Sequence, residues 1–264
     1  MRLDVTMREA VIALARQAGE QILRIYDSEF AVQAKQDRSP LTEADMASHR
    51  LIVAGLQRLT PDWPVLSEES APQDIEARRA WTRFWLVDPL DGTREFVKRN
   101  GEFTVNIALV DGDRPVFGVV YAPVLDQLFW GAPSEGAWLR QSFEADVALN
   151  VCRPAPRPLR VAVSRSHLDP ASAALIGKLH APLQKPLGSS LKFCQLAEGL
   201  VDLYPRFGPT GEWDTAAGQA VLEAAGGAVL DLHGNALRYN QRDGLINPDF
   251  IALGDTDLPW REWL

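Results

Sequence analysis

Two apolar segments separated by a short turn, residues 103–110 and 115–122, constrain the fold of this chain more than any other feature. They read FTVNIALV and PVFGVVYA, and Asp111-Gly112-Asp113 lies between them. Runs of β-branched and aromatic residues on either side of an Asp-Gly turn predict a β-hairpin. The segments QLFWGA and GAWL follow and extend the same pattern. The first half of the chain is therefore predicted to contain an antiparallel sheet.

Amphipathic helices are predicted before this sheet. Thr6 and Glu9 form a capping-box pattern, and apolar residues recur at helical spacing from Val11 to Ile25. A second helix is predicted to start at Thr42, which places Asp45 in its first turn.

The pattern changes near Pro154. The stiff segment RPAPRP resembles a linker, and the strand LRVAVS follows it. Helices are then predicted near residues 169–180, 189–199 and 213–225, and strands near 201–204 and 228–231. We therefore predict an α+β domain at residues 1–154 and an α/β domain at residues 155–264.

The charge balance excludes some kinds of ligand. The 264 residues include 27 Lys and Arg against 35 Asp and Glu, which gives a net charge of -8. Such a chain offers no broad basic face for a nucleic-acid polymer. An acidic protein that handles an anionic substrate needs cations to offset the repulsion, and a divalent metal is the usual one.

The sequence shows no signal-peptide core and no run of about 18 apolar residues, so we expect no integral membrane segment. Cys152 and Cys194 have no CxxC spacing and are predicted to be reduced thiols. We predict a cytoplasmic protein, with peripheral attachment at the cytoplasmic face of the inner membrane as an alternative. The sequence does not identify any protein partner.

Two aspartates interrupt an apolar run in FWLVDPLDGT. A buried strand is predicted to end at Asp88, and Pro89 keeps Asp88 out of helix. Asp91-Gly92 favours a tight turn in which the glycine adopts a positive φ. The pattern predicts two carboxylates on a rigid loop, and the alternative is that they only close a turn.

Other acidic residues also follow apolar elements. Glu68 and Glu69 come after PVLS, and Asp214 opens the small-residue helix WDTAAGQAVLEAAGG. Carboxylates about 4 Å apart repel by roughly 4 kcal/mol at an effective dielectric constant near 20, so a cluster requires raised pKa values or bound cations. Oxygen ligands alone select Mg²⁺ or Mn²⁺. The backbone N–H groups of Gly92 and Thr93 are placed to bind a phosphate oxygen.

The segments LSEES, WLVDPLDGT and WDTAAGQAVLEAAGG together resemble the metal-dependent, lithium-sensitive phosphatases of the inositol monophosphatase superfamily. The resemblance begins with ARQAGE and LTEAD and covers nearly the whole chain. It implies a fold of mixed α+β and α/β type, a five-layered α-β-α-β-α sandwich with metals between the two domains.

The same resemblance implies roles for single residues. Glu68, Asp88 and the backbone carbonyl of Leu90 would bind one Mg²⁺, and Asp88, Asp91 and Asp214 a second. A third ion near Glu68 would balance the charge of four carboxylates and a phosphate dianion, and Mn²⁺ is an alternative metal. Thr93 and Asp45 would orient and deprotonate a water that attacks phosphorus in line, without a covalent intermediate.

The segments VSRSH, LGSSLKFCQLAEG and KRNGEFTVNIAL are similar to the bacterial 3'(2'),5'-bisphosphate nucleotidases of this superfamily. The similarity implies a small nucleotide substrate, adenosine 3',5'-bisphosphate, with 3'-phosphoadenylyl sulfate as a second one and a link to sulfur assimilation. Nucleotide contacts are implied for Gly92, Thr93, Ser164, His167, Gly188, Lys192 and Asp214, with Arg206 at the second phosphate.

Simpler interpretations remain at this point. His167 could cap the following helix, and Lys192 could be a solvated helix charge. The same metal centre could serve an inositol-1-phosphate or broad sugar-phosphate phosphatase. A nucleotide sensor without turnover is the non-enzymatic alternative.

Overall fold

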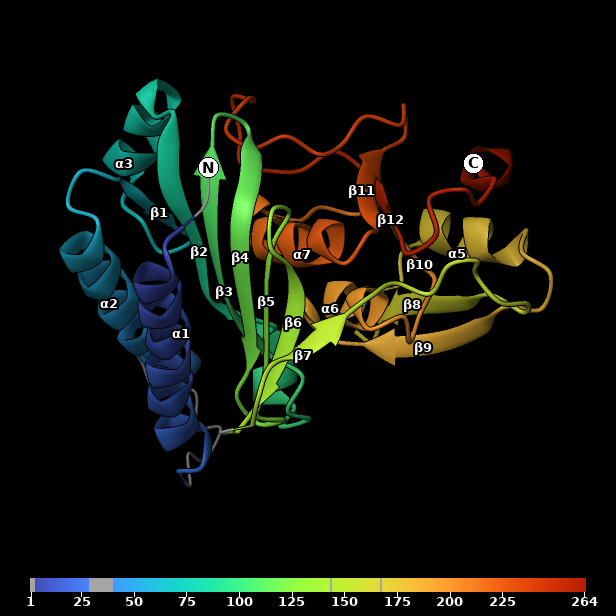
Figure 1. Ribbon diagram of the computed structural model, residues 1–264. Helices are drawn as coiled ribbons and strands as arrows, with labels where there is room; N and C mark the ends of the chain where they lie inside the picture. The colour runs from blue at the N-terminus through green and yellow to red at the C-terminus, as the bar shows by residue number, and fades with distance from the viewer. Residues whose placement is uncertain (1–2, 29–39, 143, 167) are drawn as a thin grey trace.

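Two β-sheets and three layers of helices make up the computed structural model, which describes residues 3–28, 40–142, 144–166 and 168–264 (Figure 1). Helices α1 and α2 cover the outer face of the first sheet. Helices α6 and α7 lie between the two sheets, and α5 covers the outer face of the second sheet. The predicted five-layered α-β-α-β-α arrangement is therefore confirmed.

The first sheet has the strand order β1-β2-β3-β4-β5-β6-β7. Strands β1 and β2 are parallel, and each later neighbour is antiparallel. The predicted hairpin is confirmed as β3 and β4, and the two segments after it as β5 and β6. The strands are β1 (Val65–Ser67), β2 (Arg83–Asp91), β3 (Thr104–Asp111), β4 (Arg114–Ala122), β5 (Gln127–Ala132), β6 (Gly136–Gln141) and β7 (Val147–Leu149).

The second sheet has the order β11-β12-β10-β8-β9 and mixes parallel and antiparallel pairs. Strands β8, β10 and β11 were predicted, whereas β9 and β12 were not. The strands are β8 (Arg160–Ser164), β9 (Leu183–Leu187), β10 (Leu203–Arg206), β11 (Ala228–Asp231) and β12 (Phe250–Leu253).

Five of the seven described helices follow predicted segments with shifted ends, whereas α3 and α4 were not predicted. They are α1 (Val5–Tyr26), α2 (Pro40–Leu59), α3 (Pro72–Ala77), α4 (Thr93–Val97), α5 (Pro170–Gly177), α6 (Leu191–Ala197) and α7 (Glu212–Ala224). Two short 3-10 helices, η1 (Arg78–Ala80) and η2 (Trp260–Trp263), complete the described elements.

Both predicted helix starts near the N-terminus are wrong by a few residues. Asp4, rather than Thr6, caps α1, because its Oδ1 accepts a hydrogen bond of 2.8 Å from Met7 N. Helix α2 begins at Pro40 instead of Thr42, since proline is readily accommodated in a first helical turn. Asp45 consequently lies in the second turn of α2.

The predicted loop from Asp88 to Asp91 is also wrong. Strand β2 continues through Pro89 and Leu90 to Asp91, because Asp91 still pairs with Thr104 of β3. The register between β2 and β3 shifts between Asp88 and Asp91, which accommodates the missing N–H of Pro89. The positive φ predicted for Gly92 is confirmed at 92°, although this residue caps α4 and closes no tight turn.

The division at residue 154 stays a prediction. The first sheet ends with β7 before this residue, and the second sheet begins with β8 after it. However, one cluster of buried side chains runs from Phe84 of the first sheet through Phe193 of α6 to Phe250 of the second. This shared core packs the middle helices against both sheets.

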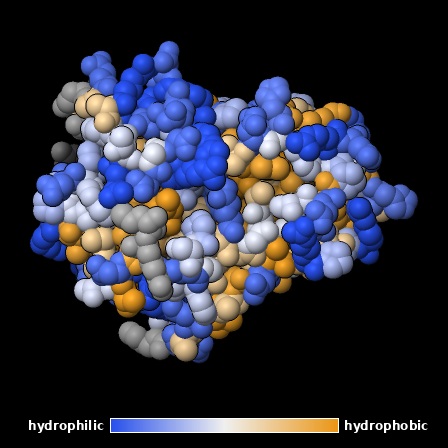
Figure 2. Space-filling model, turned by 45° about the horizontal axis from the view of Figure 1, so that its top comes forward, coloured by the Kyte–Doolittle hydropathy of each residue, from blue (hydrophilic) through white to orange (hydrophobic). Residues whose placement is uncertain are grey.

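Within the described residues, no helix combines the length and the hydropathy needed to cross a bilayer. The face in Figure 2 carries mainly hydrophilic residues, with hydrophobic residues in smaller groups between them. Cys152 and Cys194 are free thiols, as predicted.

Candidate active site

Three aspartates meet where the end of β2 approaches the N-terminus of α7. Asp88 and Asp91 lie on β2, and Asp214 is the third residue of α7. One carboxylate oxygen of each side chain lies within 4.8 Å of those of the other two. The fold thus brings together residues that are more than 120 positions apart in the chain.

Backbone amides hold two of these carboxylates in place. Leu90 N donates to Asp88 Oδ1 over 3.0 Å, and Gly211 N donates to Asp214 Oδ2 over 2.8 Å. Asp214 also lies in the first turn of α7, where the helix dipole favours a negative charge. Leu90 is itself almost fully buried beside Asp88.

The cluster is electrostatically unfavourable when it holds only carboxylates. Burial, followed by repulsion from Asp91, raises the pKa of Asp214 to about 7. Burial and the neighbouring acids also raise the pKa of Asp88 well above its usual range. The pKa of Asp91 is raised by burial, against the attraction of Lys192. Bound cations would relieve this repulsion, and the oxygen-only donors fit a hard divalent ion.

Glu68 lies directly after β1, and its backbone N donates to Val87 O of β2 over 3.0 Å. Its pKa rises to about 7 through burial and then through repulsion from Asp214 and Asp91. The negative charge of the aspartate cluster therefore acts on Glu68, although the Glu68 carboxylate is not one of the three whose oxygens lie within 4.8 Å of one another.

Asp45 of α2 is buried and interacts electrostatically with Glu68 and Glu69. Its pKa rises to about 8, first through burial and then through Glu69 and Glu68. Its Oδ1 atom is buried and has no hydrogen-bond partner among the described residues. An unpartnered buried carboxylate oxygen is a suitable acceptor for a bound water. Thr93, its predicted companion, is the exposed first residue of α4, and a contact between the two stays a prediction.

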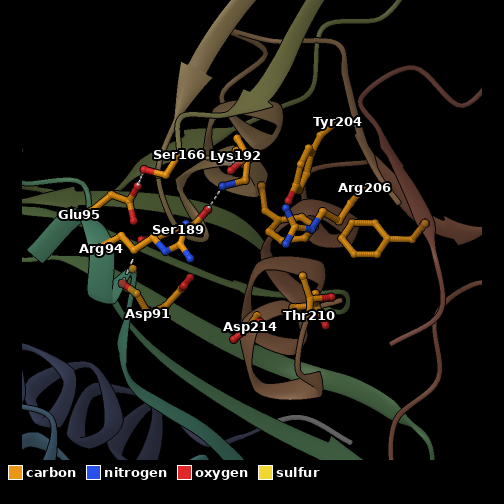
Figure 3. Close-up of a pocket in the computed structure, with 16 residues that line it drawn as sticks. Asp91, Arg94, Glu95, Ser166, Ser189, Lys192, Tyr204, Arg206, Thr210 and Asp214 are labelled. Carbon is orange, nitrogen blue, oxygen red and sulfur yellow. Dashed lines mark hydrogen bonds between the residues drawn. The ribbon is translucent and has the colours of Figure 1, made fainter. Parts of the chain in front are cut away.

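A pocket opens beside Asp91 and Asp214 between the two halves of the chain (Figure 3). Its lining includes five residues of the predicted substrate site besides Asp214, namely Gly92, Ser164, Gly188, Lys192 and Arg206. Thr93 is not part of this lining. His167 lies outside the described residues, and the cap of α5 is Asp169, whose side chain accepts a hydrogen bond from Ser172 N.

Lys192 is buried, so the interpretation as a solvated helix charge is wrong. Its ammonium group donates to Ser189 O over 2.6 Å and to Leu187 O over 3.3 Å, and it lies 5.3 Å from the centre of the Tyr204 ring. Burial lowers the pKa of Lys192 to about 8, while Asp91 opposes that shift. The side chain points into the pocket as a partly compensated cation.

Arg206 supplies a second cation to the same pocket. Its Nη2 atom donates to Pro209 O over 3.1 Å, whereas its buried Nε–H has no partner among the described residues. Figure 3 shows the Arg206 side chain beside Tyr204, across the pocket from Asp91. A guanidinium with a free donor is well suited to an anionic group.

The polar residues that hold Asp91 were not predicted from the sequence. Ser190 Oγ lies 2.8 Å from Asp91 Oδ2 and 3.0 Å from Asp214 O, and it accepts a hydrogen bond from Asn106 Nδ2 over 2.8 Å. Asn106 stands inside the apolar strand β3. A polar residue in a buried strand needs a partner, and that signal could have found it.

Comparison with known proteins gives consistent matches. The model of the inositol monophosphatase family matches residues 4–256. The 3'(2'),5'-bisphosphate nucleotidase CysQ of Salmonella typhimurium is 50% identical over 246 residues, which cover 92% of this chain and 98% of the relative. The protein of the same description from Haemophilus influenzae is 36% identical over 262 residues and covers 99% and 97%.

Solved structures agree. The crystal structure of CysQ from Bacteroides thetaiotaomicron has a TM-score of 0.85 and 42% identity, covering 93% of this chain and 96% of its own. An inositol monophosphatase from Zymomonas mobilis has a TM-score of 0.79 at 23% identity over 99% of both chains, which shows the fold alone. Because the family model and these relatives span nearly the whole chain, this protein belongs to the inositol monophosphatase family.

Proposed function

We propose that this protein is a 3'(2'),5'-bisphosphate nucleotidase that releases the 3'-phosphate of adenosine 3',5'-bisphosphate and leaves AMP. The observation that carries the proposal is the pocket that Lys192 and Arg206 line together with Asp91 and Asp214. A substrate with two phosphates needs a metal site for one and separate cations for the other. The 50% identity to relatives named as bisphosphate nucleotidases supports this choice.

The proposed cofactor is Mg²⁺, two or three ions, with Mn²⁺ as a substitute. Glu68, Asp88 and the Leu90 carbonyl would hold one ion, and Asp88, Asp91 and Asp214 another. The fit rests on the raised pKa values of these buried acids and on a donor set without sulfur or imidazole. When bound, the metal supplies Lewis-acid stabilisation of charge on the phosphate oxygens.

The chain's own residues would move the proton and orient the reactants. Asp45 would accept the proton of the attacking water at its unpartnered Oδ1 atom. The cations of the neighbouring site would lower the pKa of Asp45 from about 8, so that the base is ionised at neutral pH. Thr93 would orient the same water, and the reaction would proceed in line without a covalent intermediate.

The pocket would hold the rest of the nucleotide. Gly92 exposes its backbone at φ 92°, where a side chain would be strained and would collide with Ser189 Oγ. Gly188 and Ser164 line the same wall, and Lys192 and Arg206 would bind the phosphate that is not cleaved. 3'-Phosphoadenylyl sulfate carries the same scissile group and is proposed as a second substrate. The proposed compartment is the cytoplasm, and peripheral membrane attachment stays a prediction.

The substrate preference is the first test. We expect Mg²⁺-dependent phosphate release from adenosine 3',5'-bisphosphate to be at least about tenfold more efficient than release from inositol 1-phosphate, a difference of about 1.4 kcal/mol in transition-state binding. Phosphate release is measured with both substrates, with a metal-free control. The reverse ratio would assign the protein to inositol phosphates, and no release from either would favour a sensor.

The second test replaces Lys192 with alanine. Loss of this cation should raise KM for the bisphosphate nucleotide by about tenfold or more, since a hydrogen bond to a charged group contributes about 1.5–3 kcal/mol. The effect on inositol 1-phosphate should be much smaller. Equal losses with the two substrates would show that Lys192 only supports Ser189 and Leu187, its backbone partners.

A further inference from the structure

Glu102, a carboxylate outside the proposed set of site residues, joins the two sides of the pocket. It lies between α4 and β3, in the first half of the chain, and its side-chain partners among the described residues belong to the second half. Glu102 Oε2 accepts a hydrogen bond of 2.7 Å from Gly188 N. Its two oxygens also accept from Nε and Nη2 of Arg165, each over 2.6 Å. Such a bidentate pair is strong and directional.

The guanidinium group of Arg165 extends this link to the ends of β8 and β9, the two strands that lead into the pocket wall around Gly188. Arg165 directly follows β8, and its Nη2 also donates to Pro186 O of β9 over 2.7 Å. Gly188 follows β9 and packs so closely that an added Cβ would lie 2.6 Å from Glu102 O. The carboxylate therefore fixes the ends of two neighbouring strands at once.

Gly188 is continuous with residues that contact the aspartate cluster. Ser189 has a φ of 46°, a conformation that non-glycine residues adopt only when the surroundings hold them there. Its Oγ lies 2.9 Å from Asp91 O and 2.7 Å from Glu102 O, and its carbonyl accepts from Lys192 (Figure 3). A shift of Gly188 would therefore displace Lys192 relative to Asp91.

We propose that Glu102 is a positioning residue that fixes the nucleotide side of the pocket, Gly188 with Lys192, relative to the aspartate cluster. The inference rests on the proposed function, because a bisphosphate must reach both sides at the same time. If one side of the pocket moved relative to the other, a bisphosphate could not contact both sides fully, and its binding would weaken. Glu102 touches no reacting atom in this scheme and acts through Gly188 and Arg165.

The test compares Glu102→Ala with Glu102→Gln. The alanine variant loses both the Gly188 and the Arg165 contacts but keeps the backbone carbonyl that Ser189 uses. We expect its KM for adenosine 3',5'-bisphosphate to rise at least about tenfold, with kcat within about threefold of wild type. Glutamine retains an oxygen acceptor for Gly188 N, so the rise in KM should be at most about threefold.

Asp111→Ala is the matched control. Asp111 pairs with Arg83 in a similar fork at the opposite end of β2 and β3, far from the pocket. This variant should leave both KM and kcat unchanged. Hydrogen exchange of peptides that contain residues 183–193 provides a second readout, because Glu102→Ala should free the Gly188 amide and speed exchange there about tenfold. Asp111→Ala should not.

Two results would overturn the role of Glu102. One is a fall in kcat at constant KM in Glu102→Ala, which is the mark of a smaller folded fraction. The other is unchanged exchange at residues 183–193. If the wild type released no phosphate from the nucleotide, the proposed function would fail, whereas the exchange measurement would still decide whether Glu102 holds this wall.

Discussion

Replacing Asp91 with asparagine is expected to lower kcat/KM for phosphate release at least about 100-fold, which corresponds to about 2.7 kcal/mol of transition-state stabilisation. Asparagine keeps the volume of the side chain. It also keeps an oxygen that can accept a hydrogen bond from Ser190 Oγ, which in the wild type lies 2.8 Å from Asp91 Oδ2. It removes one negative charge from the three aspartates that converge within 4.8 Å. Metal affinity and catalysis should both suffer.

The same substitution should not destabilise the metal-free protein. Burial raises the pKa of Asp91, so the charged carboxylate is unfavourable in the folded state. A neutral amide also relieves repulsion on Asp214 and Glu68, whose raised pKa values both depend in part on Asp91. The Tm without metal should equal or exceed that of wild type, while the Tm gain on adding Mg²⁺ should shrink.

Asp111→Asn is the control, because it changes the same residue type on the neighbouring strand away from the cluster. It should leave turnover and the Mg²⁺ response unchanged. Wild-type turnover in Asp91→Asn would remove Asp91 from the set of proposed metal ligands. A large fall in the metal-free Tm would show instead that its hydrogen bonds to Ser190 and Asn106 dominate.

The local sequence was sufficient where one element determines the outcome. The β3–β4 hairpin follows from strand residues around Asp-Gly, and the positive φ of Gly92 follows from the residue type. It was insufficient where a distant partner decides. Strand β2 does not stop at Asp88, because Thr104 of β3 pairs with Asp91 beyond it. Strand β9, LQKPL, is mostly exposed and contains a proline, so it carries no pattern of a buried strand.

The candidate site shows the same limit. The three aspartates could be found because each follows or opens an apolar element, which is a local pattern. The burial of Lys192 could not be predicted from the sequence, since it arises from the position of α6 between two sheets. Glu102 gives no local signal at all. Its partners Arg165 and Gly188 lie 63 and 86 residues away in the chain, and only the packing of the two halves brings them together.

The stability of the metal-free protein should fall as the pH rises from about 6 to about 8.5. Five site acids have folded-state pKa values above their ordinary ones. Burial raises those of Asp88 and Asp91, and the values are about 8 for Asp45 and about 7 for Glu68 and Asp214. For such groups the stabilising contribution is fully present below the ordinary pKa near 4. It is lost as the pH rises through the folded-state pKa, because the unfolded chain has already released these protons.

Mg²⁺ should weaken this pH dependence by binding the ionised carboxylates in the folded state. The metal-free Tm is expected to fall by about 5 °C or more across this pH range, since about 1 kcal/mol corresponds to roughly 2–4 °C for a chain of this size. With saturating Mg²⁺ the decline should be much smaller. His49 and Lys192 act in the opposite direction, because burial lowers the pKa of each, but Lys192 contributes only above about pH 8 and the raised acids outnumber the two.

Thermal unfolding in EDTA and in Mg²⁺ at several pH values measures the fall of the metal-free Tm with pH and its reduction by Mg²⁺. The variant Asp45→Asn tests whether the site acids cause the fall. This variant removes an acid whose pKa is about 8, so its metal-free Tm should decline less steeply between about pH 7 and 8.5. Release of protons on Mg²⁺ binding, seen as a dependence of the binding enthalpy on the buffer, should accompany the stabilisation. A metal-free Tm that stays level or rises with pH would mean that these carboxylates are ionised without a cation. The electrostatic reason for placing metal at this cluster would then be lost, whatever the activity of the protein.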